Sequence, residues 1–154
     1  MNTSDLKKLI LSGSLDDQFK MLYQDVEASK ARYANAIDGF VEVFGNREEV
    51  RIFSAPGRTE VGGNHTDHQH GRVLAGSVNL DVIAIVSKND DNVVRIESKG
   101  YKVDPVDLNC LEANEAEYGK TSALIRGCCA FFKKAGHNIG GFNAFTTSDV
   151  LGGS

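Results

Sequence analysis

Polar side chains that could grip a small hydroxylated or phosphorylated molecule gather in one segment, residues 54–80. This segment combines the guanidinium of Arg58, the imidazole of His65 and the carboxylate of Asp67 with several glycines. Aspartate accepts hydrogen bonds from hydroxyls, histidine donates or accepts them, and arginine supplies fixed positive charge for a carboxylate or phosphate. Glycine lets the backbone turn tightly and approach a ligand closely. The residue types therefore predict a polyol or phosphate site.

The last residues, 148–154, form a second candidate site. The run Leu151-Gly152-Gly153-Ser154 is typical of the first half of a glycine-rich loop, which aims backbone N–H groups at phosphate. Glycine clusters are also common in ordinary turns and tails. On their own, these four residues favour that simpler interpretation.

The histidines of the first segment raise the alternative of a metal-binding loop. Possible zinc or nickel ligands within six residues are His65, Asp67, His68 and His70. Residues two apart on an extended segment share a face, so the first two ligands are separated from the last two. The remaining histidine, His137, is isolated. We therefore predict no metal site, whereas a metal-binding protein would retain stoichiometric zinc through gel filtration.

Composition restricts the class of protein. With 154 residues, 25% of them charged, the chain has the make-up of one globular domain. Its net charge of −4 argues against a nucleic-acid partner bound through phosphate contacts. No apolar stretch approaches the roughly 20 residues that span a bilayer. We expect a small-molecule partner, no nucleic acid and no membrane, and the sequence leaves the oligomeric state open.

The chain start and the cysteines predict the compartment. The first residues lack the long apolar segment and cleavage site of a secretory signal. The three cysteines, Cys110, Cys128 and Cys129, form neither a disulfide framework nor a Cys-x-x-Cys pair. We therefore expect a cytoplasmic protein with reduced, mostly buried thiols.

Helical periodicity appears in three stretches. Residues 4–12 predict a short helix, and residues 14–44 predict a second one, which Ser14 opens with Asp17 as its capping partner and Gly45 ends. A break in that helix is expected near residues 28–31. Residues 118–135 predict a third helix with an apolar side formed by Leu124, Ile125, Cys128, Phe131 and Phe132.

Strand-like patterns fill most of the remaining chain. Residues 50–54 predict a short strand that leads into the polar segment, and residues 73–88 predict one long strand or two joined by a bend. Residues 89–92 have turn composition, which makes residues 93–99 the expected hairpin partner. Residues 141–147 alternate well enough for a last strand. This order of elements predicts an α+β domain.

The polar segment resembles a known signature. The residues that carry the resemblance are Ala55-Pro56-Gly57-Arg58, then Gly63, His65-Thr66-Asp67, Gly71, Val73 and Leu74. They look like the galactokinase signature of the superfamily of galactokinase, homoserine, mevalonate and phosphomevalonate kinases. Residues 151–154 resemble the start of that family's ATP loop, in the family's order and at about its separation. The resemblance covers about residues 35–154.

The resemblance implies a fold. It is that of the N-terminal domain of this kinase superfamily, a mixed sheet packed with helices like domain 2 of ribosomal protein S5, with an unusual left-handed crossover. Residues 1–45 are expected to form an N-terminal helical segment. Residues 46–154 are expected to form an incomplete N-terminal α/β domain of the kinase.

The resemblance also implies an activity. This is transfer of the ATP γ-phosphoryl group, with Mg²⁺, to the anomeric hydroxyl of galactose or a related hexose. Carried over by position, Arg58 is the catalytic candidate and stabilises charge near the transferred group. The substrate-binding candidates are Asn64, His65 and Asp67. The ATP-binding candidates, which would begin the phosphate cradle, are Gly152, Gly153 and Ser154.

Four positions depart from the family pattern. The family commonly has asparagine at Glu60, an aliphatic residue at Gly62, an acidic residue at Asn64 and tyrosine at His68. Asn64 matters most, because an amide replaces a carboxylate that accepts charge-assisted hydrogen bonds from a sugar. This puts a strict preference for galactose in doubt.

The family's catalytic aspartate, the rest of its ATP loop and its C-terminal domain all fall beyond residue 154. We therefore expect residues 1–154 alone to be inactive and the longer protein to be a sugar kinase. A second possibility is a galactose sensor without catalytic activity, since galactokinase-like folds also serve as sugar-dependent regulators. The residues after 154 would separate the two, because an intact ATP loop and catalytic aspartate favour the enzyme.

Overall fold

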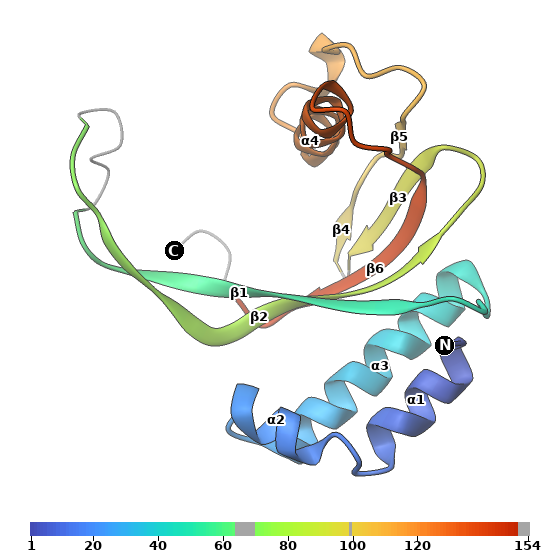
Figure 1. The fold of residues 1–154 in the computed structure, drawn as a ribbon, viewed down its shortest axis with the longest axis vertical. Helices are drawn as coiled ribbons and strands as arrows, with labels where there is room; N and C mark the ends of the chain where they lie inside the picture. The colour runs from blue at the N-terminus through green and yellow to red at the C-terminus, as the bar shows by residue number, and fades with distance from the viewer. Residues whose placement is uncertain (64–69, 99, 151–154) are drawn as a thin grey trace.

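The computed structural model describes residues 1–63, 70–98 and 100–150, which form a mixed sheet with helices on both faces (Figure 1). In chain order the elements are α1 (Thr3–Leu11), α2 (Asp16–Leu22), α3 (Val26–Phe44), β1 (Arg51–Gly62), β2 (Leu74–Lys88), β3 (Val93–Ser98), β4 (Tyr101–Lys102), β5 (Val106–Asp107), the 3₁₀ helix η2 (Glu115–Glu117), α4 (Thr121–Lys134) and β6 (Phe142–Ser148). This architecture confirms the predicted α+β class.

The long helix predicted over residues 14–44 is two helices. α2 ends at Leu22, and α3 begins after Asp25, whose carboxylate accepts a hydrogen bond from the backbone N–H of Ala28 at 2.9 Å. The break therefore lies at residues 23–25, because an aspartate N-cap starts a new helix there. Gly45 ends α3 with a φ of 73°, a conformation that glycine adopts without strain. The end of the helix was predicted correctly, whereas the break was expected near residues 28–31 and lies a few residues earlier.

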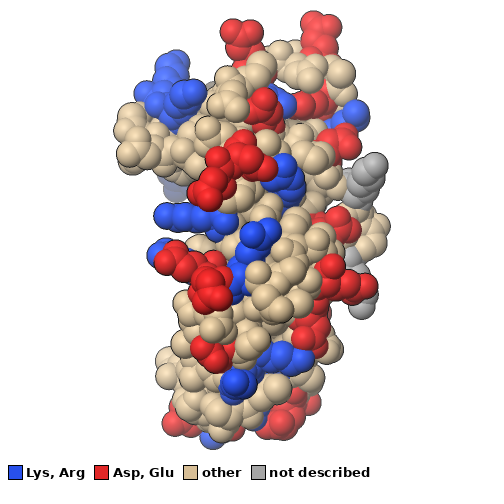
Figure 2. Space-filling model, turned by 90° about the vertical axis from the view of Figure 1, so that its right-hand side faces the viewer, with Lys and Arg blue, Asp and Glu red and all other residues tan. Residues whose placement is uncertain are grey.

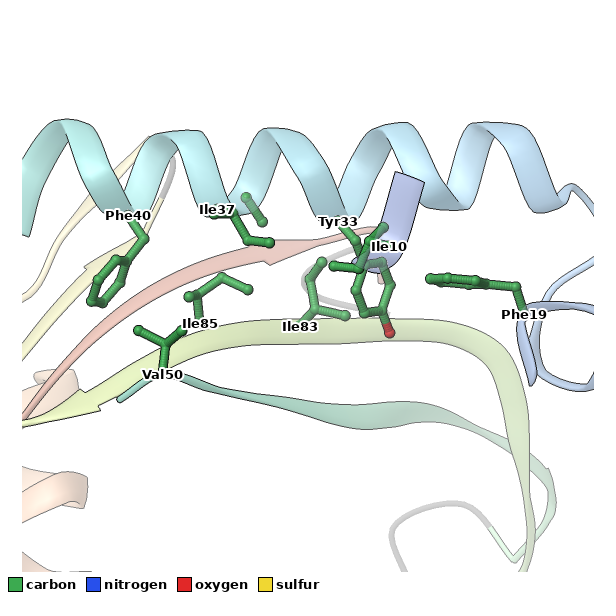
Figure 3. Packing of buried hydrophobic residues seen from close by; sticks show 9 residues of the cluster. Ile10, Phe19, Tyr33, Ile37, Phe40, Val50, Ile83 and Ile85 are labelled. Atoms are coloured by element: carbon green, nitrogen blue, oxygen red, sulfur yellow. The ribbon is translucent and has the colours of Figure 1, made fainter. Parts of the chain in front are cut away.

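The main core lies between α3 and the sheet (Figure 3). Ile37 and Phe40 of α3 meet Ile83 and Ile85 of β2, and none of these side chains is more than 1% exposed. Residues two apart on a strand share a face, so β2 presents its isoleucines to the helix as one row. Burying each such side chain contributes about 1.5–3 kcal/mol. This packing anchors β2, which carries one half of the polar segment.

The sheet order is β1-β2-β6-β3-β4, with β5 paired to β3, so the predicted hairpin of residues 73–88 with residues 93–99 is wrong. β6 lies between them, antiparallel to β2 and parallel to β3. Residues 89–92 therefore cross the start of β6. Gly141 allows the crossing, because a Cβ at this position would lie 2.1 Å from Oδ1 of Asn89 and 2.7 Å from the backbone nitrogen of Val93.

We expect Gly141→Ala to destabilise the full-length protein by about 1–3 kcal/mol, because the backbone of Val93 cannot move away as a flexible side chain would. Urea unfolding followed by circular dichroism measures the loss. The matched control is Gly140→Ala, since a Cβ at residue 140 meets no atom within 4 Å among the described residues. Equal stability of the two variants would contradict this account of the crossing.

α4 lies on the opposite face of the sheet from α1, α2 and α3 (Figure 1). Of its predicted apolar side, Ile125 packs against a small second core around Val94 and Val106, and it is joined there by Cys129, which was not part of the prediction. Leu124 is 72% exposed and Phe131 is 68% exposed. The apolar periodicity identified the helix but overstated how much of it is buried.

The prediction of mostly buried thiols is wrong, because Cys110 and Cys128 are exposed and Cys129 is half-buried. Arg126 explains the orientation at residue 110. Its guanidinium donates to both carboxylate oxygens of Glu117, at 2.7 and 2.8 Å, and its Nη1 donates to the backbone carbonyl oxygen of Cys110. The carbonyl of this loop residue therefore faces inward and its thiol faces water.

Charges of both signs lie side by side on the face shown in Figure 2. Within the described residues, no helix is long and apolar enough to cross a membrane. The expected cytoplasmic location and the expected absence of a nucleic-acid partner stay predictions.

Candidate functional site

The polar segment consists mainly of two paired strands, so the predicted strand over residues 50–54 was too short. β1 continues through Gly62 and pairs antiparallel with β2 from Leu74 onward. The two strands extend beyond the rest of the sheet as a twisted ribbon (Figure 1). The predicted sugar-binding residues Asn64, His65 and Asp67 lie outside the described residues, as does His68.

One glycine of the segment has the close-approach role expected of it. Gly63 has a φ of 94°, and a Cβ there would lie 2.3 Å from the backbone oxygen of Arg72 and 2.9 Å from the Cα of Val73. The two sides of the ribbon thus meet backbone to backbone just before residue 64. A side chain at residue 63 would force them apart.

A β-bulge places the predicted catalytic arginine. Pro56 pairs with Asp81 and Arg58 pairs with Ser77, so the single residue Gly57 faces three residues, 78–80, of β2. Bulges bend a ribbon and re-aim its side chains. Arg58 is exposed, and its guanidinium has no hydrogen-bond or ion-pair partner among residues 1–63, 70–98 and 100–150. It can therefore bind an anion without breaking a contact to those residues.

The two candidate segments meet at this bulge. A Cβ on Gly57 would lie 3.1 Å from both methyl carbons of Val150 and 3.2 Å from a methyl carbon of Val78. Val150 therefore packs directly on the residue before Arg58. The predicted ATP-binding residues Gly152, Gly153 and Ser154 lie outside the described residues, but the chain that leads to them contacts the residue before Arg58.

Next to the bulge lies a carboxylate that the sequence analysis did not identify. Asp81 is only 3% exposed. Its side chain accepts hydrogen bonds from Ser54 Oγ at 2.5 Å, Tyr23 Oη at 2.6 Å and Arg32 Nη1 at 2.6 Å. Arg32 also donates from Nη2 to the backbone oxygen of Asp81 at 2.8 Å. The end of α2, the start of α3 and both strands of the ribbon are joined at this one carboxylate.

The charge state of this network follows from its contacts. Burial alone would raise the pKa of Asp81, but hydrogen bonds from Ser54, Tyr23 and Arg32 outweigh it and hold the pKa below its ordinary value. Burial and the hydrogen bond to Asp81 both raise the pKa of Tyr23. The carboxyl group is therefore ionised at neutral pH, and the phenol keeps the proton that it donates.

A sequence signal could have identified Asp81. It is the one charged residue in the apolar run 78–86, and it shares a face with Ile83 and Ile85. A charge on the core-facing side of a strand has to be paired. Arg32 carries no such signal, because an arginine beside an apolar helix stripe looks the same in sequence whether it meets a carboxylate or water.

Known proteins resemble this chain in both sequence and structure. Residues 38–88 match the galactokinase galactose-binding signature. Galactokinase from Streptococcus suis is 34% identical over 119 residues, which cover 75% of this chain and 30% of that protein. Galactokinase from Streptomyces coelicolor is 30% identical over 115 residues, with the same coverage of 75% and 30%.

A solved galactokinase structure also resembles this chain. The crystal structure of Lactococcus lactis galactokinase complexed with galactose superposes with a TM-score of 0.67 and 28% identity, over 79% of this chain and 32% of that one. The matching region is the N-terminal portion of that enzyme. The chain thus spans about 30% of the length of the curated relatives it matches.

Proposed function

Because the chain is related to the galactokinases and matches their N-terminal portion, we propose that it is the N-terminal part of a hexose kinase. The full-length protein transfers the γ-phosphoryl group of ATP, with Mg²⁺, to the anomeric hydroxyl of galactose or a related hexose. Residues 1–45 are its N-terminal helical segment, and residues 46–154 are the first part of its kinase domain.

The packing of Val150 on Gly57 is the observation that carries this proposal. It brings the chain that enters the glycine-rich residues against the residue before Arg58. Phosphoryl transfer needs the nucleotide phosphates, the acceptor hydroxyl and a positive charge at one place. The contact between segments about 90 residues apart in sequence supports this requirement being met in the full-length protein.

Each candidate residue has a role in this proposal. Arg58 stabilises the charge on the transferred phosphoryl group, since its guanidinium is exposed and has no partner among the described residues. Hydroxyls of the hexose are bound by Asn64, His65 and Asp67. Backbone N–H groups for the ATP phosphates come from Gly152, Gly153 and Ser154. Mg²⁺ is a partner of the nucleotide phosphates.

The test is ATP consumption by the full-length protein with a panel of hexoses. We expect turnover with galactose or a hexose that shares most of its hydroxyl geometry, and Asn64 leaves room for a preference other than galactose. Residues 1–154 alone serve as the inactive control. A protein that binds a hexose but consumes no ATP would be a sensor, and one that binds neither ligand would overturn the proposal.

We expect Asp67→Ala to weaken hexose binding by the full-length protein about 10-fold to 100-fold, because a carboxylate that accepts charge-assisted hydrogen bonds is lost. ATP affinity should stay within about twofold. Calorimetric titration with each ligand separates the two effects. His70→Ala is the control, since His70 is exposed at the end of the same ribbon. Unchanged hexose affinity in Asp67→Ala would contradict the assignment.

A further inference from the structure

Arg32 is tied to the end of β6 as well as to Asp81. Its Nε lies 3.0 Å from Oδ2 of Asp149, an ion pair that lacks the direction of a hydrogen bond. The backbone N–H of Asp149 donates to the backbone oxygen of Asp81 at 3.1 Å. The same oxygen accepts the hydrogen bond from Arg32 Nη2. Asp149 is therefore held through its backbone and through its side chain.

These contacts fix where the chain goes after β6. Asp149 follows the last residue of the strand and precedes Val150, the residue that packs on Gly57. The Arg32 side chain is 16% exposed and is bound to a carboxylate that is 5% exposed, so it forms a fixed point. The Asp149 side chain is 49% exposed. The largely buried Arg32 thus holds the half-exposed Asp149, which lies just before residues 151–154 in the chain.

We propose that Arg32 and Asp149 are positioning residues that set the affinity of the full-length protein for nucleotide, by holding the chain after β6 against the bulge at Gly57. This rests on the proposed function, because it takes residues 152–154 as the phosphate cradle. Neither residue touches the nucleotide. Their effect passes through Asp81 and the packing of Val150.

Asp149→Asn is the informative variant. It keeps the shape of the side chain and the backbone hydrogen bond while removing the charge that Arg32 meets. Since half-exposed ion pairs contribute at most about 1 kcal/mol, the fold is preserved. Asp38→Asn is the matched control, because Asp38 forms an ion pair with Lys7 at 2.6 Å and is 57% exposed. Asp38 lies on α3, as Arg32 does, but its partner Lys7 lies on α1.

The measurement is calorimetric titration of the full-length protein with a non-hydrolysable ATP analogue and Mg²⁺, beside a separate titration with hexose. We expect Asp149→Asn to weaken analogue binding about fivefold and Asp38→Asn to leave it within about twofold. Hexose affinity stays unchanged in both variants. In an Arg32→Gln background the same Asp149→Asn change has no further effect, because its partner is gone.

The proposal is overturned by a loss of less than twofold, by an equal loss in the Arg32→Gln background, or by an equal weakening of hexose binding. A purely structural role would move both ligands together. A wild-type protein that binds the analogue but phosphorylates no hexose disproves the proposed function alone, and the affinity comparison still decides this inference. A wild-type protein that binds no nucleotide disproves both.

Discussion

Replacing Arg58 by alanine should lower the kcat of the full-length protein about 10²-fold to 10³-fold and change its KM values for ATP and hexose by no more than about twofold. The guanidinium is exposed beside the bulge and is engaged by no described residue, so the change leaves no buried group unpaired. A charge that acts on the transition state lowers turnover when it is removed, whereas a charge that only binds substrate raises KM.

Steady-state kinetics with both substrates varied measures this effect. Arg51→Ala is the control. Arg51 is an exposed arginine on the same strand, and it pairs with Val86, far from the bulge. Arg58→Lys keeps the charge but not its planar geometry and should recover only part of the turnover. An increase in KM with kcat unchanged would remove Arg58 from the reaction and leave it a binding residue.

Local patterns in the sequence predicted the elements better than their arrangement. Gly45 marked the end of α3, and the apolar runs marked β2 and β6, because caps and periodicities are properties of neighbouring residues. The insertion of β6 between β2 and β3 depends on Gly141 meeting Asn89 and Val93, which are about 50 residues away. No pattern within a short window contains that contact.

In the candidate site, too, local motifs were predicted and contacts between distant segments were not. The motif around Arg58 was visible as a run of residue types, and the match to the galactokinase signature agrees with it. The contact of Gly57 with Val150 could not be predicted from sequence. It exists because β6 pairs with β2 beside β1, and no local pattern predicts that order of strands. The network at Asp81 was missed because its donors come from the residue after α2, from α3 and from β1.

The buried carboxylate carries the largest expected effect on stability. We expect Asp81→Asn to lower the free energy of unfolding of the full-length protein by about 3–5 kcal/mol at pH 7, because Arg32 loses its buried carboxylate partner and keeps only the half-exposed one of Asp149. Asp38→Asn, which breaks the exposed pair with Lys7, should cost less than about 1 kcal/mol. Urea unfolding of the three proteins at pH 7 makes the comparison.

The difference in stability between wild type and Asp81→Asn should also depend on pH, with a sign that follows from the pKa of Asp81. The network lowers the pKa of Asp81 in the folded state, so its contribution is complete above the unfolded pKa of about 3.9 and is lost as the pH falls through the folded value. The difference in unfolding free energy between wild type and Asp81→Asn should therefore be constant from about pH 7 to pH 5 and shrink below about pH 4. Once protonated, the wild-type carboxyl group is neutral like the amide and meets Arg32 no better. A difference that stayed constant down to pH 3 would mean that packing around Asp81, and not its charge, holds α2 and α3 to the ribbon beside Arg58.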